Sequence, residues 1–139
     1  MKSQRRLRMN FLEVKAELES QFSTWKNSAY PAIQVHWENT TLNNVSNWYF
    51  AINILPSVST DVEIGRNCAI LSQGLMNIRI IGPTNSGSGS GFGYADAIVA
   101  AFENKKFSDI VTDAAQMNVV GEVENKFVLT VSVPWRVHR

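Results

Sequence analysis

The first clear pattern in the chain is an apolar stripe that predicts a helix over residues 10–26. Apolar residues recur at steps of three and four, which places them on one face of a helix. They are Phe11, Val14, Leu18, Phe22 and Trp25. Asn10 suits the N-cap, and Glu13 three residues later completes a capping box. Pro31 cannot continue the helix, so we interpret the stripe as a core-packing face.

Alternation of apolar and polar residues predicts strands in much of the remaining chain. These strands cover residues 33–37, 48–55, 71–81, 118–123 and 127–137. The second is apolar on nearly both sides, as in a centrally placed strand. We expect Pro56 to stop that strand. Because proline donates no hydrogen bond to a sheet, Pro134 is expected to put the last strand on an edge or beyond its neighbours.

Two connections between these elements attract attention. Residues 57–69 form a polar segment, long for a hairpin, that carries Asp61, Glu63 and Arg66. Long loops in compact domains are often functional or mobile. Residues 107–111 are expected to form a turn of helix.

A glycine- and serine-rich tract at residues 85–93 separates the third strand from a second apolar helix, an order in which many nucleotide sites begin. A P-loop requires a lysine after its glycines, and no lysine occurs between Lys26 and Lys105. The dinucleotide spacing GxGxxG also fails, because its last position falls on Phe92 or Tyr94. We interpret the tract as a flexible strand-to-helix connection.

Composition and charge exclude several classes of protein. The 139 residues are 45% hydrophobic and 18% charged, as in one ordinary globular domain. The net charge is +1, but Lys2, Arg5, Arg6 and Arg8 are all the charges of residues 1–8, so the remainder carries −3. We expect residues 1–8 to be a mobile basic arm and residues 9–139 a single domain. An export signal and a membrane span are not predicted, which favours an intracellular, soluble protein.

The sequence gives little support for an enzyme or a metal centre. Cys68 is the single cysteine and has no adjacent base. His36 and Glu38 share one face of a predicted strand, but a third ligand is not visible nearby, and His138 is at the far end of the chain. We predict no catalytic residues, no metal and no cofactor. The predicted fold is α+β, with one mostly antiparallel sheet of four or five strands and two helices on one face.

Short landmarks recur in a fixed order along the chain. They are Trp37, Glu38 and Asn39 after a strand, Leu55 and Pro56 at the end of the next, and Val131, Pro134, Trp135 and Arg136 near the end of the chain. In this order they resemble the small tail terminator, or tail-completion, proteins of long-tailed bacteriophages and prophages. The resemblance covers nearly all the chain from Met9 onward.

The resemblance implies a structural role in the virion tail, assembled in the cytoplasm of the bacterial host. Tail terminators form a ring, usually of six copies, that caps the tail tube and receives the head. The implied partners are therefore further copies of this chain, the tail tube protein and the head–tail connector, with DNA only as cargo and with no membrane. A closed ring needs a heterologous interface, in which one patch meets a different patch of the next copy.

We assign candidate interface residues on this basis: Asp61, Glu63, Arg66, Arg79 and Arg136. Two alternatives remain open. The chain could be another head–tail neck or completion protein, or, from a different class, a small α+β ligand-binding domain or enzyme.

Overall fold

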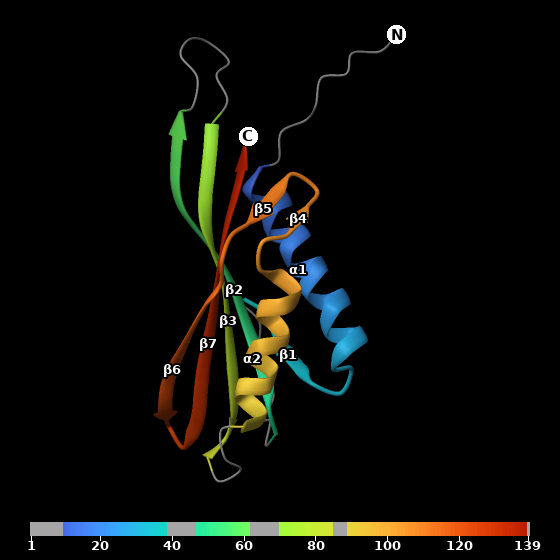
Figure 1. The fold of residues 1–139 in the computed structure, drawn as a ribbon, viewed down its shortest axis with the longest axis vertical. Helices are drawn as coiled ribbons and strands as arrows, with labels where there is room; N and C mark the ends of the chain where they lie inside the picture. Colours follow the sequence, from blue (N-terminus) through green and yellow to red (C-terminus); the bar gives the residue numbers. More distant parts are fainter. Residues whose placement is uncertain (1–9, 39–46, 62–69, 85–88, 139) are drawn as a thin grey trace.

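The computed structural model describes residues 10–38, 47–61, 70–84 and 89–138, which form two helices and seven strands (Figure 1). The helices are α1 (Phe11–Ala29) and α2 (Gly89–Phe102). The strands are β1 (Gln34–His36), β2 (Tyr49–Asp61), β3 (Ile70–Pro83), β4 (Lys106–Phe107), β5 (Ile110–Thr112), β6 (Gln116–Val123) and β7 (Lys126–His138).

All seven strands belong to one sheet, in the order β1-β2-β3-β7-β5-β4, with β6 also paired to β7. β1 is parallel to β2, whereas the remaining pairs are antiparallel. The α+β prediction is confirmed. The prediction of a mostly antiparallel sheet of four or five strands is corrected, because the sheet is mixed and has seven strands.

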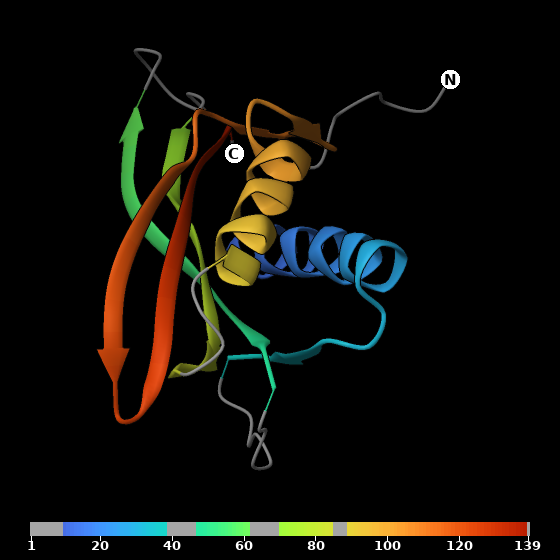
Figure 2. The ribbon, with the colours of Figure 1, turned by 60° about the horizontal axis from the view of Figure 1, so that its bottom comes forward.

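Both helices lie on the same side of the sheet (Figure 2). The side chains that β2, β3 and β7 direct toward the helices form the core, and most are fully buried. They include Phe50, Ile52, Met76, Ile78, Ile80, Leu129, Val131, Val133 and Trp135. No helix of the described residues covers the opposite side, which we call the open face (Figure 2).

Phe22 of α1 lies at the centre of an aromatic cluster that joins the layers. It is fully buried, and its ring lies 5.8 Å from Phe50 of β2 and 5.8 Å from Phe102 of α2, measured between centroids. Trp25 and Trp37 also contact it, at 5.5 and 6.3 Å. Such pairs add about 0.5–1.5 kcal/mol each to the free energy gained by burial.

The first helix forms as its sequence predicts. Asn10 accepts a hydrogen bond from the backbone N–H of Glu13 at 2.8 Å, and the Glu13 carboxylate accepts the Asn10 N–H at 2.8 Å. This reciprocal pair satisfies two of the donors that a helix start leaves unpaired. The helix continues to Ala29, three residues beyond the predicted end.

Pro56 does not stop β2, contrary to the prediction. The strand continues to Asp61, with a register shift between Pro56 and Val58. Beyond Ala51, β1 no longer pairs with β2, so Pro56 lies on an edge. There its missing N–H removes no ladder bond, because the donor that proline lacks would have faced away from the sheet.

The prediction that Pro134 puts the last strand on an edge or beyond its neighbours is also wrong, because β7 is an internal strand. Pro134 pairs with Leu75 of β3 on one side. On the other side the neighbouring chain passes from β5 to β6, and there the Asp113 N–H donates to the Pro134 carbonyl at 2.9 Å. The proline therefore lies at the gap between two partner strands, where a donor is not required.

The helical turn predicted near residue 110 is wrong. Residues 106–107 and 110–112 are the short strands β4 and β5. Thr112 is buried, and its hydroxyl donates to the Phe102 carbonyl at 2.5 Å while accepting from the Lys105 N–H at 2.8 Å. The hydroxyl thus links the end of α2 to β5 of the sheet. The periodicity of the local sequence does not predict this contact, because it joins two separate segments.

The glycine tract is partly helical, which corrects its interpretation as a flexible connection. α2 begins at Gly89, and Gly91 is a buried residue of that helix. A Cβ on Gly91 would overlap Leu129 and approach the Trp48 ring to 2.9 Å. Here glycine allows the helix to approach the sheet closely. Residues 85–88 lie outside the described part of the chain.

Gly74 has a similar packing role on β3. Trp135 is its cross-strand partner, and a Cβ on Gly74 would overlap both the indole of Trp135 and the carbonyl oxygen of Leu55. The glycine therefore makes room for a fully buried tryptophan.

Replacing Gly74 with alanine should destabilise the protein by about 1–3 kcal/mol, because a methyl group has to displace the indole or the backbone. The matched control is Gly93→Ala, where nothing lies within 4 Å of the added Cβ and the helix gains up to about 1 kcal/mol. Chemical denaturation measures both. Equal stabilities of the two variants would contradict the packing role of Gly74.

Phe22→Ala should lower the free energy of unfolding by about 3–5 kcal/mol, since it empties the centre of the aromatic cluster. Leu12→Ala, on the same helix, is the control: Leu12 is 74% exposed, so its truncation should change stability by at most about 0.5 kcal/mol. A loss for Phe22→Ala as small as that of the control would exclude Phe22 as the centre of the core.

Candidate functional site

The open face carries a mixture of apolar and polar side chains. Ala51 and Ile81 are buried, at 1% and 7% exposure, while Leu55 and Leu75 are 44% and 38% exposed. Leu55 and Leu75 are directly paired across β2 and β3. The exposed apolar side chains of the open face therefore lie near the middle of β2, at the Leu55–Leu75 pair.

Arg79 and Arg136, two of the predicted interface residues, both belong to the open face but lie apart. Arg79 pairs with Thr130, six residues before Arg136 on β7. At about 3.3 Å per residue, this separates the two positions by about 20 Å along the strand. The two arginines therefore do not form one basic patch.

Each arginine has a different environment. Arg136 forms an ion pair with Asp113, through Nε to Oδ2 at 3.3 Å and Nη2 to Oδ1 at 3.4 Å. Both side chains are more than 40% exposed, so solvent screens the pair. The Nε atom of Arg79 is buried and has no hydrogen-bond partner among the described residues.

Of the other three predicted residues, the structure describes Asp61. Asp61 is the last residue of β2 and pairs with Ile70 of β3. Glu63 and Arg66 lie outside the described residues. The hairpin of β2 and β3 extends from one end of the molecule, and the hairpin of β6 and β7 extends from the other (Figure 1).

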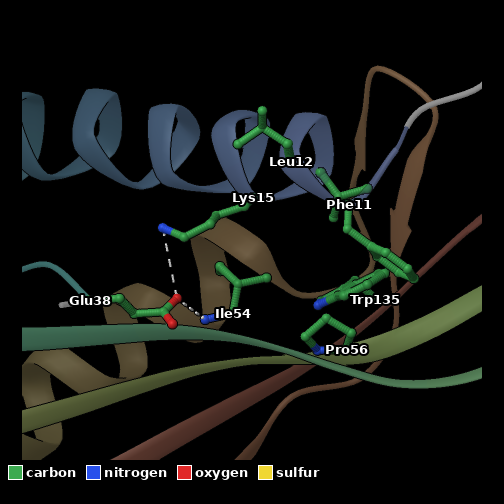
Figure 3. A pocket seen from close by; sticks show the side chains of 8 residues that line it. Phe11, Leu12, Lys15, Glu38, Ile54, Pro56 and Trp135 are labelled. Atoms are coloured by element: carbon green, nitrogen blue, oxygen red, sulfur yellow. Dashed lines mark hydrogen bonds and ion pairs between the residues drawn. The ribbon is translucent and has the colours of Figure 1, made fainter.

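A hollow of about 260 Å³ lies between the start of α1 and the edge of β2 (Figure 3). Its lining is largely apolar: Phe11, Leu12, Val14, Ile54, Pro56 and Trp135, with Lys15 and Glu38 at one end. The Trp135 ring is 1% exposed, and its Nε1 has no hydrogen-bond partner among the described residues. A buried donor without an acceptor costs about 1–3 kcal/mol.

Glu38, at the polar end of this hollow, protects the edge of β2. Its Oε1 accepts the Ile54 N–H at 2.8 Å and lies 3.9 Å from Lys15 Nζ (Figure 3). The carboxylate thus accepts a hydrogen bond from a backbone N–H that would otherwise be unpaired on an edge strand. Within the described ranges, no group of three or more metal-ligating side chains gathers around His36 and Glu38 or elsewhere.

A second hollow, of about 350 Å³, lies on the other side of Trp135. It is lined by Ser57, Gln73, Gly74, Leu75, Asp113, Pro134, Trp135 and Arg136. Both hollows therefore adjoin the same end of the sheet. Arg136 lines the second hollow, and the Asp113 carboxylate, which also lines it, forms an ion pair with Arg136.

A surface that sequence reasoning missed lies on β6. Met117, Val119 and Val120 are 38%, 51% and 54% exposed. Met117 pairs with Val131 and Val119 with Leu129, so both point to the helix side of the sheet. They remain exposed because β6 lies at the sheet edge away from both helices (Figure 2).

Two features of the sequence relate to the apolar surfaces at the first hollow and on β6. Leu12 is a large apolar residue that falls outside the apolar stripe of its helix. Residues 117–120 read Met-Asn-Val-Val, an apolar strand with few polar positions. Neither signal reveals exposure, because exposure depends on what the tertiary structure packs against each strand. Separately, none of the helices in the described ranges has the length and apolar character of a membrane span.

Arg136→Gln should change the free energy of unfolding by less than about 1 kcal/mol, because an exposed ion pair contributes little. Lys106→Gln, an exposed cation on the short strand β4, is the charge-matched control. Thermal or chemical denaturation checks both variants. A loss of several kcal/mol for Arg136→Gln would contradict this prediction and would mean that the ion pair makes a large contribution to the stability of the fold.

The comparisons with known proteins agree with this architecture. One solved structure, known by a sequence identifier alone, aligns with a TM-score of 0.72, covering 93% of this chain and 96% of its own, at 17% sequence identity. At that identity the likeness establishes the fold. No curated protein matches the sequence.

The family comparison is more specific. The profile described as "phage tail terminator protein" matches residues 13–135, which include α2, all but the first two residues of α1 and nearly the whole sheet. That family is structural, not enzymatic, and membership indicates a component of the phage tail. The resemblance seen in the sequence is confirmed, and this chain belongs to the phage tail terminator protein family.

Proposed function

We propose that this chain assembles into a ring that caps the tail tube and joins it to the head. The observation that carries the proposal is the family match over residues 13–135. A ring of identical copies requires two different surfaces on each copy. The described residues include two candidates, the apolar hollow beside β2 and the exposed apolar residues of β6.

The proposed partners follow from this role. The chain contacts further copies of itself, six in the expected ring, together with the tail tube protein and the head–tail connector. DNA passes through the ring as cargo. The chain acts without catalytic residues or a cofactor, as a part of the virion tail that is assembled in the host cytoplasm.

The proposal is tested with the tail tube protein encoded beside this chain in its phage or prophage. Tubes polymerised from that protein are incubated with the purified chain and viewed by electron microscopy. We expect rings at one end of each tube and an end to tube growth. Tubes that keep elongating, with no ring bound at either end, would overturn the proposal.

The end of the β2–β3 hairpin is proposed to contact a neighbouring copy or the tube, through Asp61, Glu63 and Arg66. Asp61 and Ile70 are paired, so an Asn-Gly turn in place of residues 62–69 can close the hairpin without changing the register. We expect this variant to fold and to bind tubes at least about tenfold more weakly. Unchanged ring formation and tube binding would exclude the segment from the interface.

A further inference from the structure

The two long edges of the sheet are protected to very different degrees. On β2, β1 covers residues 49–51, Glu38 occupies the Ile54 N–H, Pro56 has no N–H, and a register shift follows. These are the features by which proteins prevent unwanted strand pairing. β6 also has a register shift, between Val119 and Gly121, but its residues 116–119 before that shift contain no proline and no charge.

The exposed large hydrophobic side chains of the described residues fall into two groups that match these edges. One group surrounds Pro56 of β2 and consists of Phe11, Leu12, Leu55 and Leu75. The other is on β6 and consists of Met117, Val119, Val120 and Val123. Apolar side chains that gather in one place on a protein surface are typical of interaction sites.

The two groups also match in how they are divided between the faces of the sheet. Near Pro56, Phe11 and Leu12 lie on the helix side, whereas the Leu55–Leu75 pair is on the open face. On β6, Met117 and Val119 point to the helix side. Val123 pairs with Lys126, which stacks over the Tyr49 ring of the open face at 5.9 Å, so Val123 belongs to the open face.

We propose that β6 of one copy packs beside the middle of β2 of the next copy, and that this is the contact between adjacent subunits of the ring. Met117 and Val119 then enter the hollow beside Leu12 and Pro56 on the helix side. The inference rests on the proposed ring, and it adds which two surfaces meet. Residues 52–61 of β2, beyond the end of β1, are long enough to face the eight residues of β6.

Strand directions allow this contact without reversing either copy. β2 is antiparallel to β3, β3 to β7, and β7 to β6, so β6 runs opposite to β2 within one chain. Two copies in the same orientation therefore place β6 antiparallel to β2 of the next copy. The helices of all copies then lie on one side of the combined surface and the open faces on the other.

Side chains must supply most of the contact energy. Because Ile54 and Pro56 offer no free N–H, a regular ladder along this part of β2 is blocked. The hollow instead provides an apolar floor and one buried donor, Trp135 Nε1.

The test uses two variants with opposite charges, Val119→Asp and Leu12→Lys, each at an exposed position. In a sample of one variant, the introduced charge faces the unmodified apolar surface of the adjacent copy, which should weaken self-association at least about tenfold and abolish rings on tubes. Ser20→Asp, at an exposed position of α1, is the control and should assemble normally. Circular dichroism verifies that all variants fold.

A mixture of the two variants is the decisive arm, because alternating copies place aspartate against lysine at one contact and two apolar surfaces at the next. We expect rings to return in the mixture. Normal rings from each variant alone, or no recovery in the mixture, would overturn the packing of β6 against β2. A wild-type chain that forms no ring would instead overturn the proposed function.

Discussion

The structure depends on the burial of one side of the sheet beneath two helices, with Phe22 at the centre. The Phe22 ring touches aromatic residues from α1, from the segment after β1, from β2 and from α2. Trp25 of α1 adds contacts to Phe50 of β2 and Phe102 of α2, at 6.0 and 5.8 Å between ring centroids. Because both helices are held on this side, no helix in the described part of the chain covers the opposite face or the outer strand β6.

This one-sided arrangement leaves surface that is useful for assembly. Exposed apolar side chains that lie together are typical of surfaces where proteins associate. Here they lie at two opposite edges, near Pro56 and along β6. Two different surfaces on opposite edges suit a head-to-tail contact, which is the kind of contact that closes into a ring.

The protection of the β2 edge affects how another strand can be recognised there. Glu38 and Pro56 prevent β2 from pairing with any strand that happens to be extended, while the adjacent hollow keeps an apolar binding surface. Recognition by side-chain shape is more selective than recognition by backbone hydrogen bonds, because every strand offers the same backbone groups. In the proposed ring, this selectivity would favour contact with further copies of this chain over contact with unrelated strands.

The sequence by itself determined the local features whose cause is local. The capping box at Asn10 and Glu13, the stripe of α1 and the alternation of β7 each depend on neighbours within a few residues. The ordered landmarks, from Trp37 to Arg136, also identified the family. Proline and glycine were harder to interpret, because their effect depends on what lies beside them.

Only the tertiary structure decided those positions. Pro56 continues a strand because its side of β2 is an edge, Pro134 is tolerated because its neighbour changes from β5 to β6, and Gly91 is helical because α2 packs tightly on Trp48 and Leu129. The exposure of Val119 likewise depends on where the helices stop. Such long-range packing cannot be read from the order of residues, since each case is set by segments distant along the chain.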